Sequence, residues 1–173
     1  MSTARRGVLF IFLAAFAMLA LAQSGDEAIA KLQEAVNSDP QNVGAWVNLG
    51  QAFLEVDRLE EAKDSFLEAI AIDYLSGDAH FGLGLTEYAR GDYQAAIFAF
   101  NEVARLYPER FDGQFNRAVT LARLRQTEES IQAFNEAIAQ AEPEASSEDL
   151  TNAYLGLAAQ LKRLERYAEA AEA

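Results

Sequence analysis

A spacing of 34 residues recurs along most of the chain, and it is the feature that most constrains the fold. Three columns at this spacing hold small or apolar side chains almost throughout. The columns read Ala28, Ala62, Ala96 and Ser130; Leu32, Phe66, Phe100 and Phe134; and Ala35, Ala69, Val103 and Ala137. One column could arise by chance, but several columns in register over about 110 residues indicate a repeat array.

The residue types within one period resemble the tetratricopeptide repeat (TPR), a unit of two helices joined by a turn. The stretch from Trp46 to Phe53 resembles the motif W-x-x-L-G-x-x-Y, and Ala62 and Phe66 match the later A-x-x-x-F. Pro40 and Pro108 stand at the late proline position. The resemblance implies an all-α fold, an α-solenoid wound as a right-handed superhelix with about eight helices after the leader.

The spacing also predicts how the chain is divided. We expect an N-terminal half-repeat helix at 23–42, TPR repeats at 43–76 and 77–110, a divergent repeat at 111–144 and a partial repeat at 145–173. From Ser130 to Ala170 the interval is 40 residues, which is one period plus a six-residue insertion. The partial repeat should therefore hold a first helix, followed by a second helix that begins near Tyr167. Its packing positions would be Tyr154, Leu157, Ala158 and Leu161.

Local residue preferences suggest where the second helices begin. Asp57 and Thr127 can each accept a hydrogen bond from the first turn of the helix that follows, so we expect them to be N-caps. Gly91 and Asp92 form the equivalent turn in the next repeat, because glycine tolerates a positive φ and aspartate caps a helix.

Residues 1–22 are expected to be a secretory signal peptide. Arg5 and Arg6 precede an apolar run from Gly7 to Leu21, and Ala20-Leu21-Ala22 gives a small-x-small cleavage pattern. The run is shorter than the roughly 20 residues of a spanning helix. Its phenylalanines leave open an uncleaved anchor as the alternative. The predicted location is therefore periplasmic or secreted, or membrane-anchored if the leader is retained.

Composition and charge argue against several functions. The net charge of −13 becomes −15 when Arg5 and Arg6 leave with the leader, and such a surface repels nucleic acid. No cysteine is present, and His80 stands in the packing column of Trp46. No phosphate-binding loop, dinucleotide fingerprint or zinc-protease motif occurs. We expect no enzyme activity, no metal and no cofactor.

The resemblance points instead to the inner surface, because first helices of TPR proteins line a concave groove that holds peptide ligands. The candidate peptide-binding positions are Val47, Gln51, Leu54, Phe81, Leu85, Tyr88, Phe115, Val119, Arg123, Leu155 and Lys162. The lysine and asparagine with which some members hold a terminal carboxylate are absent here. These side chains either form an apolar binding surface or are buried against neighbouring helices, and the sequence leaves both open.

The predicted function is an exported, non-catalytic scaffold that binds a protein or peptide of the cell envelope. The alternative is a structural module that self-assembles into a homo-oligomer through its incomplete C-terminal repeat. In both cases the membrane would be contacted only through an uncleaved leader.

Overall fold

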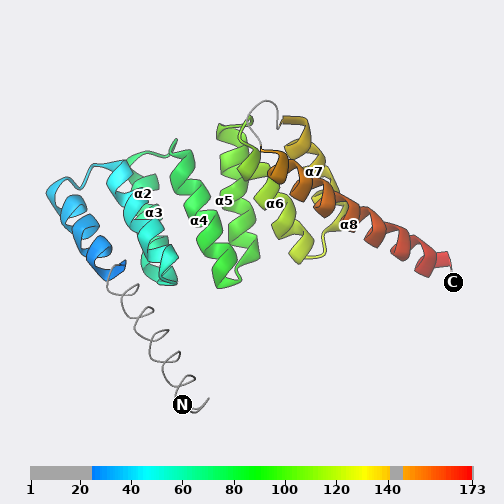
Figure 1. The fold of residues 1–173 in the computed structure, drawn as a ribbon, viewed down its shortest axis with the longest axis horizontal. Helices are drawn as coiled ribbons and strands as arrows, with labels where there is room; N and C mark the ends of the chain where they lie inside the picture. The colour runs from blue at the N-terminus through cyan, green and yellow to red at the C-terminus, as the bar shows by residue number, and fades with distance from the viewer. Residues whose placement is uncertain (1–24, 141–145, 173) are drawn as a thin grey trace, which may run out of the picture.

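The structure is a computed structural model that describes residues 25–140 and 146–172. The described elements are all helices, which follow one another in a row (Figure 1). A first helix covers residues 25–38. It is followed by α2 (Val43–Glu55), α3 (Leu59–Ile72), α4 (Gly77–Arg90), α5 (Tyr93–Leu106), α6 (Phe111–Arg123), α7 (Thr127–Gln140) and α8 (Ser147–Glu172). The predicted all-α solenoid is confirmed, while the leader at 1–22 lies outside the described residues.

Each helix packs against the next one in the chain. From α2 onward all consecutive helices are in contact, and α2 also contacts α4 as α6 contacts α8. The first helices of successive repeats therefore lie beside one another, with the second helices on the other side. This is the arrangement in which each unit covers the apolar flank of the unit before it.

The 34-residue columns form the core, as the sequence predicted. From the second member onward every residue in the three columns is buried, and the largest buried side chains include Phe66, Phe100 and Phe134. Where Ser130 replaces alanine in the divergent repeat, its hydroxyl donates to the Ala118 carbonyl at 2.9 Å. A buried hydroxyl with a partner avoids the cost of an unpaired polar group, so this repeat tolerates the substitution.

The prediction was wrong for the first members of two columns. Ala28 and Ala35 are exposed, whereas Ile29 and Val36 of the same helix are buried against α2 and α3. Ala28 and Ala35 face the side on which the first helix of a complete unit would pack. The 25–38 helix therefore contacts the core only through the face that packs against the following repeat, which is α2 and α3.

Two predicted helix caps were also wrong. Asp57 has a φ of 60° and Arg125 a φ of 61°, so both lie in the left-handed region, as Gly91 does with a φ of 81°. These three positions are 34 residues apart, so Asp57 is equivalent to the glycine of the turn and not to the capping Asp92. Of the three predicted caps, Asp57, Asp92 and Thr127, only Asp92 accepts a hydrogen bond from the first turn of its helix, from Ala95 N at 3.1 Å. Thr127 is already inside α7 and donates its hydroxyl to the Arg125 carbonyl.

The six-residue insertion before α8 is correctly placed. A Cβ added to Gly156 would collide with the Phe134 ring, and one added to Gly82 would collide with the Phe66 ring. Phe66 and Phe134 are two periods apart, and Gly82 and Gly156 are two periods plus six residues apart. The two glycines therefore let α4 and α8 approach the preceding second helix in the same way.

The predicted second helix at Tyr167 does not form, because α8 is one continuous helix from Ser147 to Glu172. Ala153 and Gln160 on its α7-facing side are buried. Tyr154 is 56% exposed and Leu161 44% exposed, and Ala158 is exposed as well. The packing positions predicted there were therefore wrong except for the partly buried Leu157, since no second helix covers that stripe in the described part of the chain.

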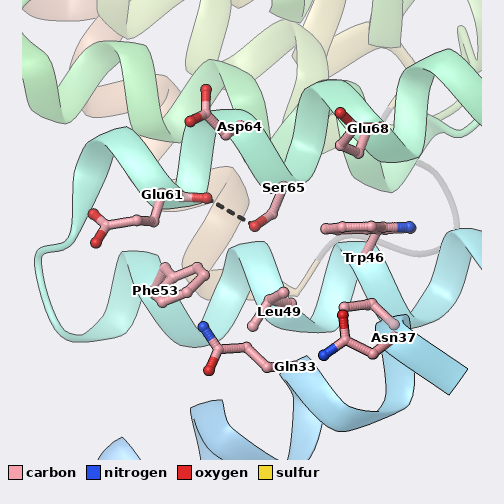
Figure 2. A pocket seen from close by; sticks show the side chains of 10 residues that line it. Gln33, Asn37, Trp46, Leu49, Phe53, Glu61, Asp64, Ser65 and Glu68 are labelled. Carbon is pink, nitrogen blue, oxygen red and sulfur yellow. Dashed lines mark hydrogen bonds between the residues drawn. The ribbon is translucent and has the colours of Figure 1, made fainter. Parts of the chain in front are cut away.

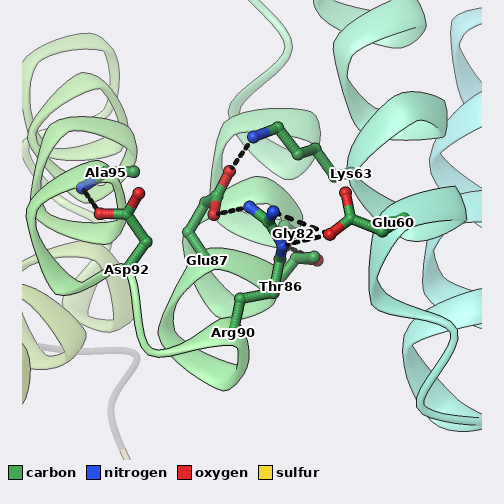
Figure 3. Close-up of polar contacts among 8 residues, drawn as sticks. All are labelled: Glu60, Lys63, Gly82, Thr86, Glu87, Arg90, Asp92 and Ala95. Atoms are coloured by element: carbon green, nitrogen blue, oxygen red, sulfur yellow. Dashed lines mark hydrogen bonds and ion pairs between the residues drawn. The ribbon is translucent and has the colours of Figure 1, made fainter.

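An ionic cluster joins the first and second complete repeats (Figure 3). Glu87 of α4 is 3% exposed, and its carboxylate pairs with Lys63 Nζ of α3 at 2.7 Å and with Arg90 at 2.5 Å. Arg90 also reaches Glu60 of α3 at 2.8 Å. Hydrogen bonds to Glu87 and then to Glu60 raise the pKa of Arg90. Two cations thus compensate the one buried carboxylate, which would be costly if left alone.

Candidate protein-binding surface

The candidate groove residues lie on four first helices, α2, α4, α6 and α8. All the apolar members on α2, α4 and α6 are half-buried, and Gln51, Arg123 and Lys162 are exposed. Leu155 on α8 is 65% exposed. The helices that carry these residues adjoin one another, because α2 contacts α4, α6 contacts α8, and Arg123 of α6 is hydrogen-bonded to Tyr88 of α4. The surface is a strip of mixed apolar and polar character.

The phenylalanines of this surface have one side in the core. Phe81 packs on Phe100 with ring centroids 5.9 Å apart, and Phe115 packs on Phe134 at 6.0 Å. Both pairs join a first helix to the second helix of the same repeat. The sequence left burial and binding as alternatives, and the structure shows that these rings contribute to packing while remaining partly accessible.

A cation covers part of the Phe81 ring. The Arg110 guanidinium lies 5.5 Å from the ring centroid and is held by Asp112 at 2.7 Å and Asp78 at 2.8 Å. Hydrogen bonds to these two carboxylates raise the pKa of Arg110, with Asp112 contributing more. This bridge was not predicted from the sequence, because Arg110 and Asp78 are 32 residues apart.

One polar contact crosses the surface from α4 to α6. Arg123 Nε donates to the Tyr88 hydroxyl at 2.9 Å, which raises the pKa of the Arg123 guanidinium. The Tyr88 ring in turn lies edge-on to Tyr93 at 5.3 Å. Two of the predicted groove residues, from adjacent repeats, are therefore in direct contact.

Val47 and Leu54 pack against the core formed by α2, α3 and the 25–38 helix. Phe115 and Val119 do the same around α6 and α7. Leu85, Gln51 and the α8 residues are not part of either cluster. Among the apolar candidates only Leu155 is exposed, so a ligand lying on the surface would find its freest apolar contact there.

His80 has a structural role, as predicted. It is buried, its ring lies edge-on to Tyr74, and Nε2 donates to the Tyr74 carbonyl at 2.9 Å. Trp46, one period earlier, makes the same bond: Nε1 donates to the Pro40 carbonyl at 2.9 Å. Each ring nitrogen thus ties a first helix to the turn before it.

The described residues show no cluster of His, Cys, Asp and Glu that could hold a metal ion. No helix among them is long and apolar enough to cross a membrane.

Comparison with protein families gives a direct result. One tetratricopeptide repeat model matches residues 53–109 and 81–146, and a second matches residues 19–80. The chain belongs to the tetratricopeptide repeat family. Proteins of this family are typically non-catalytic scaffolds for protein–protein interaction, and this TPR chain has the same architecture. No curated protein sequence matches it.

Solved structures of MamA share the fold of this TPR protein. One crystal structure of MamA has a TM-score of 0.73 at 19% identity, covering 94% of this chain and 86% of that chain. MamA AMB-1 has a TM-score of 0.68 at 22% identity, with 87% and 79% covered. MamA MSR-1 has a TM-score of 0.67 at 22% identity, with 87% and 83% covered. At this identity the likeness shows the fold alone.

Proposed function

We propose that this TPR protein is an exported scaffold that binds an extended segment of a cell-envelope protein along its first helices. The observation that carries the proposal is the strip on α4, α6 and α8, where half-buried Phe81, Phe115 and Leu85 continue to the exposed Leu155. Exposed apolar side chains rimmed by charge are typical of protein-interaction surfaces. Export is proposed from the leader pattern. Amino-terminal sequencing of exported protein tests it, with Gln23 expected as the first residue.

The binding surface is best tested away from the core. Phe81 and Phe115 are unsuitable targets, because serine there would also remove contacts with Phe100 and Phe134. We expect the double variant Leu85→Ser and Leu155→Ser to keep the fold and to weaken binding of peptides selected on the wild type about tenfold or more. The probe is a phage-displayed random peptide library selected on immobilised wild-type protein.

The matched control is Leu67→Ser and Phe98→Ser, which truncates exposed apolar residues on the second helices α3 and α5. Circular dichroism melts show whether all variants remain folded. Peptides that bind the Leu85 and Leu155 variant as tightly as the wild type would rule out the groove. Loss of binding in the control variant alone would place the site on the second helices.

A second candidate function is self-association through α8. The stripe formed by Tyr154, Ala158 and Leu161 corresponds to positions that a second helix covers in the other repeats, and it is exposed here. A second copy could bury this stripe. Light scattering tests the idea: the mass should rise with concentration, and Leu161→Glu should lower it. A mass that stays that of a monomer at all concentrations would exclude this function.

A further inference from the structure

Two crevices of the same construction lie between successive repeats, each lined by a second helix, the next first helix and the next second helix. The N-terminal crevice, between the 25–38 helix, α2 and α3, is a cavity of about 470 Å³ lined by Trp46, Leu49 and Glu68, among others (Figure 2). The space between α5, α6 and α7 is about 250 Å³ and is lined by Arg117. Arg117 is two periods after Leu49, so the two crevices can be compared residue by residue.

Glutamates stand one period apart at Glu34, Glu68, Glu102 and Glu136, and of these Glu68 lines the N-terminal crevice. Glu102 pairs with Arg105 at 2.8 Å and accepts a hydrogen bond from the Tyr74 hydroxyl at 2.6 Å. Glu136 pairs with Arg117 at 2.5 Å. Hydrogen bonds from Arg105 and then from Tyr74 lower the pKa of Glu102. In these two repeats an arginine of the same chain compensates the carboxylate.

Glu68, one period before Glu102, lacks these partners. The positions equivalent to Arg117, Arg105 and Tyr74 hold Leu49, Ala71 and Pro40, none of which can donate from its side chain. Across residues 25–140 and 146–165, no Lys or Arg lies within ion-pair distance of Glu68 or of the neighbouring Asp64. Nearby Glu61 is occupied by Arg58 at 2.6 Å.

The cavity also offers an aromatic face next to this carboxylate. Figure 2 shows Trp46 and Glu68 at one end of the cavity, with Phe53 and Glu61 at the other. The bond from Trp46 Nε1 to the Pro40 carbonyl fixes the indole. A guanidinium is attracted both to a carboxylate and to the face of an indole ring. This face of α2 differs from the groove face that carries Val47 and Gln51.

We propose that the N-terminal crevice docks an arginine side chain of a protein partner, which pairs with Glu68 and contacts Trp46. The partner's arginine supplies the cation that Arg105 and Arg117 supply within the chain at the equivalent positions. Charge complementarity selects a basic segment, because the rim carries Asp64 and Glu68. A second copy of this chain is poorly suited, since its net charge is −13. The site is independent of the groove proposed above.

Trp46 is the single tryptophan of the chain, so its fluorescence reports directly on the crevice. The probes are a short alanine peptide with two arginines and its citrulline counterpart, which has the same shape without the charge. The arginine peptide should change the fluorescence saturably, and the citrulline peptide should bind at least about tenfold more weakly. Equal responses to both peptides would overturn the proposal.

Three variants localise the effect. Glu68→Gln should weaken binding of the arginine peptide about fivefold. Ala71→Arg introduces an arginine one period before Arg105, where it can pair with Glu68 as Arg105 pairs with Glu102. It should weaken binding of the arginine peptide to a similar extent, although Ala71 does not line the cavity. Glu109→Gln, the control, changes the net charge equally on an exposed residue elsewhere and should bind as the wild type.

The proposal fails if Ala71→Arg binds the peptide as tightly as the wild type. It also fails if the fluorescence depends on protein concentration without peptide and Glu68→Gln abolishes that dependence, because a second copy would then fill the crevice. Thermal melts of the three variants should match the wild type, since Glu68, Ala71 and Glu109 are all exposed.

Discussion

Replacing Phe100 with alanine is expected to lower the free energy of unfolding by about 3–5 kcal/mol, the range for truncating a large buried aromatic side chain to alanine. Phe100 is fully buried in α5, and its ring contacts the Phe81 ring of α4. A Cβ at Gly84 would lie 2.5 Å from this ring, so the two helices are closed around it. Backbone packing of this kind cannot collapse fully into the space that the phenyl group leaves.

Phe98 provides the matched control, because it lies in the same helix two residues away and is 67% exposed. Phe98→Ala should change the free energy of unfolding by less than about 0.5 kcal/mol. Urea denaturation followed by circular dichroism measures both variants. Equal losses for the two would mean that the 34-residue columns do not mark the core.

Replacing Glu87 with glutamine is expected to cost about 1.5–3 kcal/mol of unfolding free energy, the value of hydrogen bonds to charged groups. The buried carboxylate lies between Lys63 and Arg90, and an amide would leave Lys63 without its counter-charge and Arg90 with the exposed Glu60 alone. Urea denaturation at neutral pH measures the loss. Glu60→Gln is the control, because Glu60 also binds Arg90 but its side chain is 71% exposed, and such pairs contribute about 0–1 kcal/mol.

The chain itself suggests how to rescue this loss. One period later, Ile97, Leu121 and Leu124 stand in the places of Lys63, Glu87 and Arg90. Copying them gives Lys63→Ile, Glu87→Leu and Arg90→Leu, a triple variant that we expect to be at least as stable as the wild type. Apolar replacement of a whole buried ion cluster is often neutral or stabilising. A triple variant less stable than Glu87→Gln would show that the cluster is worth more than apolar packing at this interface.

The core could be predicted from the sequence because it depends on side-chain volume that recurs at a fixed spacing. Phe66, Phe100 and Phe134 are each buried at the same position of successive repeats, so the 34-residue spacing identifies them as core residues. The left-handed turn at Asp57 was missed because its residue type suggested a cap, although it stands one period before Gly91. The turn at Arg125 was missed because Thr127, two residues later, was predicted to be the cap. The 34-residue spacing from Gly91 predicts both left-handed turns.

The surface was predicted less well, for two reasons. The exposure of Tyr154 and Leu161 depends on whether α8 is followed by a packed second helix, and the pattern at Tyr167 suggested one that does not form. The Glu68 crevice was missed because its signal is a comparison between repeats: Glu68 lacks the arginine partner that Glu102 and Glu136 have one and two periods later. That signal is present in the sequence, but the pairs Glu136–Arg117 and Glu102–Arg105 must be known first.

The central claim is that the units are stacked in a row and each is stabilised by its neighbours. Amide hydrogen exchange, measured residue by residue on the wild type and on Phe100→Ala, tests it most directly. The stacked arrangement predicts that the variant loses protection mainly in α4, α5 and α6. The 25–38 helix and α8 are expected to exchange fastest already in the wild type and to change little. An equal loss of protection in every helix from residue 25 to the end of α8 would contradict it.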